Sequence, residues 1–257
     1  MSHSERDTGV ERVCYVYGVV PADVELDEDV QGVAEPPARV QVIRRGRVAG
    51  LVSEVGVDRP LGRPDDLVAH KQVLDMVAAV APVLPMRFGA VASSAEVVAD
   101  EFLDAHQDEL AADLDDIEGY AEYVLHGRYD PDALLAAVLE ENPAAARLRD
   151  AIHGVPEDQS RDARIQLGEF IEQAVEAKRQ ADTETIKREL EPYAREVVVR
   201  DPTHEDDAIY LAVLAETGRS DELEQYAEDL ADRWDGWITP RLLGPMAAYD
   251  FVAAPET

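Results

Sequence analysis

The sequence predicts an α+β fold in two domains, and three observations carry this prediction. Short β-rich runs alternate with longer stretches whose apolar residues recur at helical spacing. The chain has 257 residues, which is enough for two domains of ordinary size. Gly119 ends a helical pattern near the middle of the chain, and a new series of strands and helices follows it. We therefore predict an N-terminal domain over 1–118 and a C-terminal domain over 119–257.

The N-terminal domain is expected to combine a sheet with two helices. Residues 1–11 are polar and are expected to be disordered. The two helices begin at Pro64 and after the capping residue Ser94. In chain order, the expected elements are a strand at 13–20, a hairpin of strands at 40–43 and 47–55, a helix over 64–81, a strand and loop at 82–91, and a helix over 94–117.

The C-terminal domain is expected to follow a β-α-α-β-β-α-β order. Its expected elements are a strand at 120–125, a helix at 131–140, a shorter helix restarting at Asn142-Pro143, a helix at 158–190, strands at 196–200 and 209–214, a helix capped by Ser220, and a strand at 237–243. With the helical insert counted as one crossover, this order is the split βαβ, ferredoxin-like pattern. The long helix has a stripe at alternating steps of four and three (Leu167, Ile171, Ala174, Lys178, Ala181, Thr185), which favours an intramolecular helical hairpin and leaves self-association open.

The net charge of the chain limits the classes of molecule that it could bind. Its 55 acidic residues against 24 basic ones give a formal net charge of −31, which repels nucleic acid and anionic lipid. Cys14 is the only cysteine, so a disulfide within the chain is excluded and a reducing compartment is favoured. The N-terminus lacks the apolar region of a signal peptide, and no stretch approaches the ~20 apolar residues of a membrane span. We expect a cytoplasmic protein.

No convincing active site, cofactor site or metal site can be found in the sequence. The cluster His204-Glu205-Asp206-Asp207 lacks the i, i+4 spacing of a helical metal pair and is expected to be a solvated acidic turn. His70 and His106 lie on predicted apolar helix faces, where each is either a general base or a core histidine bonded to a backbone carbonyl; the second interpretation is favoured. Cys14 is expected to be a small core residue. The sequence therefore predicts a protein that is not an enzyme.

Residues 82–91, which we call the signature segment, are the most informative stretch. Pro82 and Pro85 suit an edge or an extended entry, because proline lacks an N–H to donate. Gly89 permits a bulge or a close backbone approach. Arg87 stands among apolar neighbours and needs a partner or solvent for its guanidinium. We expect Arg87 to tie this segment to a carboxylate or to backbone carbonyls between the domains.

The C-terminal tail is the second informative stretch. Trp234, Trp237, Tyr249 and Phe251 concentrate aromatic mass in a chain that is only 6% aromatic. Residues 243–252 either fold back to close the gap between the domains or form an exposed docking strip, and the sequence leaves both interpretations open.

These residues carry a resemblance. The motifs appear in order as Val16-Tyr17-Gly18-Val19-Val20, His70, Val83-Leu84-Pro85-Met86-Arg87-Phe88-Gly89, and Leu243-Gly244-Pro245 followed by Tyr249, Phe251 and Val252. Together they resemble the gas vesicle protein F/L family (GvpF/GvpL) from about residue 13 to 252. The family tail reads Gly-Pro-x-Pro-Pro-Tyr-Ser-Phe, whereas Ala247-Ala248 replace the proline pair here and Asp250 replaces the serine.

The resemblance implies a non-enzymatic accessory protein of gas vesicle formation. Such a protein would bind the hydrophobic shell protein and other accessory proteins, would assist nucleation or assembly, and would associate with gas vesicles. The alternative, suggested by the fold pattern, is a ligand-sensing module. The residues expected to form the scaffold or docking surface are Pro85, Met86, Arg87, Phe88, Gly89, Trp237, Gly244, Pro245, Tyr249 and Phe251.

Overall fold

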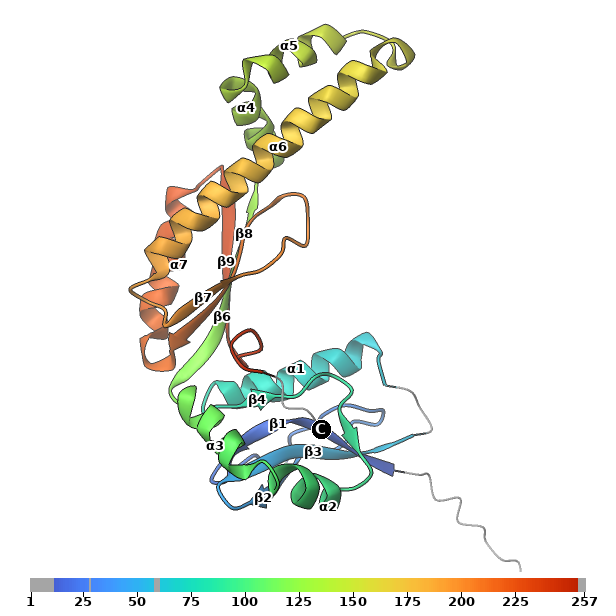
Figure 1. Cartoon of the computed structure of the whole chain (residues 1–257), viewed down its shortest axis with the longest axis vertical. Helices are drawn as coiled ribbons and strands as arrows, with labels where there is room; N and C mark the ends of the chain where they lie inside the picture. Colours follow the sequence, from blue (N-terminus) through green and yellow to red (C-terminus); the bar gives the residue numbers. More distant parts are fainter. Residues whose placement is uncertain (1–11, 28, 58–60, 254–257) are drawn as a thin grey trace, which may run out of the picture. The chain divides into compact units, whose positions relative to one another are not determined.

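The computed structural model describes residues 12–27, 29–57 and 61–253 and divides the chain into two compact units (Figure 1). Each unit contains helices and a sheet, so the α+β prediction is confirmed. The first unit runs to Glu122 and also takes the residues from Gly244 onward, while the second spans Tyr123–Leu243. The prediction had left this tail in the C-terminal domain. The predicted disorder of residues 1–11 falls outside the described residues.

The first unit contains a sheet with the strand order β2-β3-β1-β4, and β5 also pairs with β1. Its strands are β1 (Arg12–Pro21), β2 (Gln41–Arg45), β3 (Val48–Gly56), β4 (Leu84–Pro85) and β5 (Val91–Ala92). The expected hairpin is confirmed as the antiparallel pair β2–β3. The strand expected in the signature segment is only the two residues of β4, and Val91 at the end of the segment begins β5.

Strand β1 is buried on both faces, which explains its continuous apolar sequence. Tyr15 and Tyr17 point into a core that includes helix α1 (Pro64–Ala78), and Cys14 and Val16 point into a second core on the other face. The register shifts between Val16 and Gly18, and this bulge turns the later residues over, so that Val19 joins the second core.

The second core is covered by a broken helix where the sequence predicted one continuous helix over 94–117. The observed pieces are α2 (Ala95–Val97), the π-helix η1 (Val98–Leu103) and α3 (Gln107–Asp116). Val98 and Leu103 are both buried but are five residues apart, a step that an i→i+5 turn accommodates better than an α-turn. The Asp104 N–H bonds the carbonyl of Ala99 at 3.0 Å in this way.

The second unit contains a sheet with the strand order β7-β8-β6-β9. Its elements are β6 (Tyr120–Tyr129), α4 (Pro131–Glu141), α5 (Pro143–Ile152), α6 (Glu157–Leu190), β7 (Glu196–Val199), β8 (Asp207–Glu216), the 3₁₀-helix η2 (Thr217–Arg219), α7 (Ser220–Arg233) and β9 (Ile238–Met246). Strands β6 and β9 begin in one unit and end in the other. Asn142 caps α5 as predicted, whereas Ser220 is the first residue of α7 and does not cap it.

Helix α6 packs against two different elements along its length. Near its middle, Ile171, Ala174 and Val175 pack on the core that holds Leu134 and Val138 of α4, which is the expected helical packing within the chain. Near its end, the buried residues are Thr183, Ile186 and Leu190 rather than the predicted Ala181 and Thr185. The predicted stripe fails there because that part of α6 lies beside α7, where Tyr226 and Arg233 both bond Glu189.

Candidate functional site

The signature segment is built onto the first strand of the sheet. The Met86 N–H bonds the carbonyl of Tyr17 at 2.8 Å, and the Val16 N–H bonds the carbonyl of Ala90 at 2.9 Å. Pro85 and Met86 are buried, and Phe88 is half-buried on the core that holds Tyr15. Gly89 adopts a φ of +90°, which favours glycine, and donates its N–H to the Tyr15 hydroxyl at 3.2 Å. Most of this segment is therefore packing.

Arg87 does not do what the sequence predicted. Its side chain is exposed, and within the described part of the chain its guanidinium makes no hydrogen bond or ion pair. The reason is geometric: Met86 and Phe88 turn toward the core on either side, and the residue between them points outward. Arg87 is a charge presented to solvent on a rigid support.

His70 lies in an aromatic cluster beneath the signature segment. Its ring is 2% exposed, stacks on Tyr17 at 5.7 Å and meets Phe88 edge-on at 5.6 Å. Its Nδ1 lies 2.9 Å from the Tyr15 hydroxyl. Because that hydroxyl oxygen already accepts from Gly89, its hydrogen is available to donate to Nδ1. The Nε2 atom is buried without a well-formed hydrogen bond among the described residues, although the Met86 backbone lies near it.

This environment makes His70 a core histidine rather than a base. Burial lowers the pKa of His70 to about 4, and the Met86 backbone opposes this effect only in part. His106, in contrast, is exposed between η1 and α3, with its Nδ1 2.9 Å from the Phe102 carbonyl. The prediction that His106 lies on an apolar face was wrong, because the helix breaks there.

The His70 ring predicts a pH dependence of stability. The unfolded chain protonates near pH 6.5 and the folded ring only near pH 4, so protons favour unfolding between these values. The free energy of unfolding therefore falls by about 3 kcal/mol as the pH drops from 6.5 to 4. We expect His70→Phe to abolish this decrease. Urea unfolding of the wild-type and His70→Phe chains at pH 7 and pH 4.5 tests this. The difference in unfolding free energy between the two chains should change by at least half of that ~3 kcal/mol between the two pH values. A difference that does not change with pH would contradict the neutral buried ring.

The C-terminal tail meets the signature segment in the first unit. Ala247 belongs to the same core as Val83, and Val252 packs on the core that holds Met86. The Ala247 N–H donates to the Asp75 carboxylate on α1 at 3.3 Å. The two halves of the predicted signature are thus neighbours in space, although about 160 residues separate them in the sequence.

The rest of the tail is more open. Tyr249 is 40% exposed, and burial of the remainder, followed by the charge of Asp75, raises the pKa of its phenol. The Asp250 N–H donates to the buried Glu122 carboxylate at 3.0 Å. Gly244 is exposed, while Pro245 and Phe251 are half-buried. Within the tail, Ala247 and Ala248 are packed in the first unit, whereas Tyr249 is accessible.

Trp237 is the one predicted site residue that lies in the second unit. Its ring lies 5.3 Å from that of Tyr129, and the Lys178 ammonium lies 5.6 Å from its centroid. These contacts hold α6 against the strands and give Trp237 a packing role.

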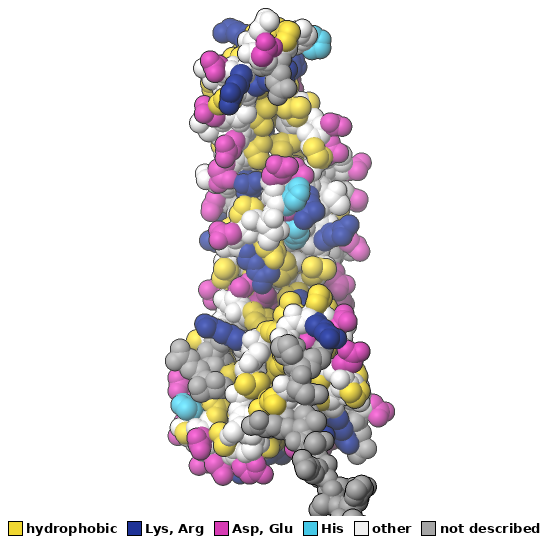
Figure 2. All heavy atoms as spheres, turned by 90° about the vertical axis from the view of Figure 1, so that its right-hand side faces the viewer, with side chains coloured by type: hydrophobic (Ala, Val, Ile, Leu, Met, Phe, Trp, Pro, Cys, Tyr) yellow, Lys and Arg dark blue, Asp and Glu magenta, His cyan; other side chains and the backbone are white. Residues whose placement is uncertain are grey.

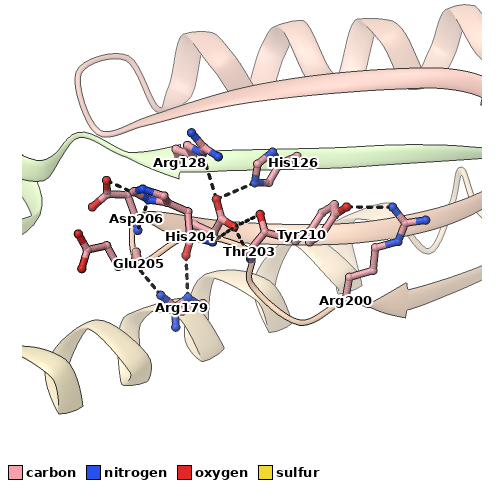
Figure 3. A network of polar contacts seen from close by, with 10 residues as sticks. His126, Arg128, Arg179, Arg200, Thr203, His204, Glu205, Asp206 and Tyr210 are labelled. Atoms are coloured by element: carbon pink, nitrogen blue, oxygen red, sulfur yellow. Dashed lines mark hydrogen bonds and ion pairs between the residues drawn. The ribbon is translucent and has the colours of Figure 1, made fainter. Parts of the chain in front are cut away.

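A buried carboxylate organises the second unit, and the sequence analysis missed it. Asp207 was expected in a solvated turn, yet it is 1% exposed at the start of β8. One carboxylate oxygen lies 2.8 Å from the His126 Nε2 and accepts from the Arg128 Nε at 3.1 Å (Figure 3). The other accepts from the N–H groups of Thr203 and His204 at 2.7 and 2.8 Å and from the Thr203 hydroxyl.

These contacts control the charge of Asp207. Burial raises its pKa, but the hydrogen bonds from His126, Thr203 and His204 outweigh burial and hold the pKa well below its usual range. Arg179 of α6 extends the network by donating to the carbonyls of Asp207 and Glu205 at 2.6 and 2.9 Å. The only sequence signal was that Asp207 begins an apolar strand, where a carboxylate needs partners.

The comparison with known families decides the identity. The family described as "Gas vesicle synthesis protein GvpL/GvpF" matches residues 13–253. This chain belongs to the GvpL/GvpF family.

Individual relatives agree with this assignment. The chain is 27% identical over 239 residues to "Gas vesicle protein F" of Dolichospermum flosaquae, and this alignment covers 92% of this chain and 96% of that protein. It is 30% identical over 242 residues to "Gas vesicle protein F" of a Streptomyces strain, covering 93% and 98%. The crystal structures of gas vesicle protein GvpF from Microcystis aeruginosa and an Anabaena species match with TM-scores of 0.74 and 0.75, each at 24% identity. They cover 93% and 95% of this chain and 98% and 99% of theirs, and they show the shared fold.

The tail of this GvpL/GvpF member departs from the pattern in a way that the structure accommodates. Ala247 and Ala248, which stand where the resemblance implied prolines, are 0% and 3% exposed. Ala247 uses its N–H to bond Asp75, a bond that proline cannot make. The backbone N–H of Asp250 is likewise bonded, whereas its side chain is exposed. Side-chain packing and backbone hydrogen bonds hold the tail here.

The remaining candidates offer little chemistry. Burial, followed by the charge of Glu54, raises the pKa of the Cys14 thiol to about 11, which disfavours the nucleophilic thiolate. Within the described residues, no group of three or more His, Cys, Asp or Glu side chains is arranged to hold a metal ion. None of the described helices combines the length and the apolar character that crossing a membrane requires.

Proposed function

We propose that this GvpL/GvpF member is a non-enzymatic accessory protein of gas vesicle formation. It binds the hydrophobic shell protein and other accessory proteins, assists nucleation or assembly, and acts in the cytoplasm in association with gas vesicles. The observation that carries the proposal is the match of residues 13–253 to a gas vesicle synthesis family. Its net charge of −31 would keep a complex with an aggregation-prone subunit in solution.

We further propose that the second unit is a modified ferredoxin-like domain with a helical insert. The strand order β9-β6-β8-β7 supports this, since it reads 4-1-3-2 when the four strands are numbered along the chain. The position of α6 and α7 side by side also supports it. Helices α4 and α5 are then the insert before the first crossover helix.

The docking surface of the first unit is proposed to centre on Arg87 and Tyr249. Arg87 lies in the signature segment and Tyr249 in the tail; both are exposed, and both stand next to buried residues, Met86 and Ala248. An exposed arginine and an exposed tyrosine are residue types that dominate binding energy at protein interfaces. Pro85, Met86, Phe88 and Gly89 would act by holding these two side chains in place.

Capture of the shell protein tests this assignment. We expect Arg87→Ala to change the free energy of unfolding by less than about 0.5 kcal/mol, since Arg87 is exposed and unpaired within the described residues. We expect it to reduce by at least threefold the shell protein that co-purifies with the chain. Arg12→Ala is the matched control, because Arg12 is also exposed and its ion pair with Glu54 is solvated.

The outcomes separate the two levels of the proposal. Wild-type capture and vesicle yield by the Arg87→Ala chain would remove Arg87 from the docking surface. Failure of the folded wild-type chain to capture the shell protein or any other gas vesicle protein would contradict the proposed function itself.

A further inference from the structure

The second unit carries an open groove that the signature residues do not use. A cavity of about 1140 Å³ lies between the start of α4, the middle of α6 and the loop that joins β7 to β8. Leu134, Ile171 and Val175 form its apolar floor, and Leu135 on its edge is 42% exposed. The groove is therefore both apolar and accessible, which is the pattern of a binding surface rather than of a core.

The walls of the groove are fixed before any partner arrives. Arg179 reaches across from α6, donates to the backbone carbonyls of Asp207 and Glu205, and forms an ion pair with Glu176 at 2.6 Å. The Asp207 carboxylate holds the same loop by accepting from the N–H groups of Thr203 and His204 (Figure 3). A groove that is already ordered loses little conformational entropy on binding.

The rim of the groove is acidic. Four carboxylates line it, and its one arginine is already paired with Glu176. Glu172 on α6 and Glu205 on the loop are exposed, and within the described residues neither side chain makes an ion pair. In the upper part of Figure 2, hydrophobic side chains lie along the middle and acidic side chains along both edges, with Lys and Arg side chains among them. This arrangement favours an occupant that is apolar in the middle and basic on both sides.

The shape of the groove selects a helix as its occupant. The lining belongs to two helices and a loop, so the described groove offers no strand edge for main-chain pairing. The lining of α6 extends from Gly168 to Gln180, a length of about 18 Å, which corresponds to about three helical turns.

We propose that this groove docks a helical segment of a partner protein, about three turns long, with a stripe of aliphatic side chains flanked by lysine or arginine. The proposal goes beyond the proposed function, because it assigns a second contact in the second unit and holds for any partner that carries such a segment. The groove and the Arg87 surface are then separate sites.

Peptide binding to the full-length chain tests the proposal. The probe is a labelled 14-residue peptide of leucine and lysine, with leucines at i, i+3, i+4 and i+7, and fluorescence anisotropy measures its affinity at 150 mM salt. A scrambled peptide of the same composition separates groove binding from general attraction to an acidic protein. We expect the scrambled peptide to bind at least tenfold more weakly, and a version with glutamate in place of lysine not to bind.

Two matched variants locate the site. Leu135→Arg should weaken binding at least tenfold, whereas Leu67→Arg, at a leucine of α1 that is 54% exposed, should leave affinity within twofold. If circular dichroism shows that Leu135→Arg is misfolded, Glu172→Lys replaces it, and peptide affinity is expected to fall at least threefold. Equal binding of the scrambled peptide, or equal loss in the α4 and α1 variants, would overturn the proposal. Loss of shell-protein capture with intact peptide binding would count only against the proposed function.

Discussion

Replacement of Gly18 by alanine should destabilise the first unit strongly. A Cβ at this position would lie 2.7 Å from the Leu84 carbonyl oxygen and 2.9 Å from a Leu74 methyl group. The carbonyl belongs to β4, which pairs with β1 at Gly18, so the signature segment would have to move away from the sheet. Overpacking of this kind costs about 1–3 kcal/mol, measured as a change in the free energy of unfolding in urea.

Gly50 is the matched control for this prediction. It lies in the neighbouring strand β3, but a Cβ there would meet side chains only at 3.5 Å, an ordinary contact distance. Alanine is favoured over glycine inside a strand by about 0.5–1 kcal/mol, so Gly50→Ala should be neutral or stabilising. Destabilisation of equal size in both variants would show that the close approach of β4 does not set the cost.

Replacement of Asp207 by alanine should be the most damaging change in the second unit. It would leave the N–H groups of Thr203 and His204 without their acceptor and would remove the buried carboxylate that faces Arg128. Loss of the hydrogen bonds to this buried charged acceptor costs about 3 kcal/mol. Hydrogen exchange should show faster exchange in the loop 200–206, in addition to the lower free energy of unfolding.

The pH dependence provides a second test of Asp207. Its pKa is depressed in the folded chain, so its contribution is complete above the unfolded value of about 3.9 and is lost as the pH falls below it. The difference between wild type and Asp207→Ala should therefore be largest near neutral pH and should shrink below pH 4. Asp206→Ala is the control, because Asp206 is only partly buried and pairs with a half-exposed His204. An unchanged difference at pH 3 would argue against the charge of Asp207.

Several features of the fold could be predicted because they depend on local patterns. The proline at the start of α1, the Asn142-Pro143 restart and the hairpin at Arg44-Arg45-Gly46 were all read from neighbouring residues, and all lie where they were expected. The family was recognised from motifs near the start, in the middle and at the end of the chain, although the motifs alone did not show that Val83 and Ala247 share a core.

Other features could not be predicted because they depend on distant neighbours. The sequence pattern from Val98 to Leu103 was compatible with a regular α-helix. The π-helix is explained only by the packing of both residues on one core, which the sequence does not show. Arg87 is exposed because its neighbours Met86 and Phe88 turn toward the core. The sequence of the segment does not show which of its side chains face the core and which face solvent.

By itself, the sequence determined the α+β class, the order of nearly all the elements and membership of the GvpL/GvpF family, because periodicity, turn residues and motifs are properties of short segments. The tertiary structure decided which polar groups are buried and which are presented. Asp207 became the anchor of a loop, Arg87 an exposed charge, and the tail a part of the first unit. The physical reason is that burial, and with it the cost of an unpaired charge, depends on segments brought together from far apart in the chain.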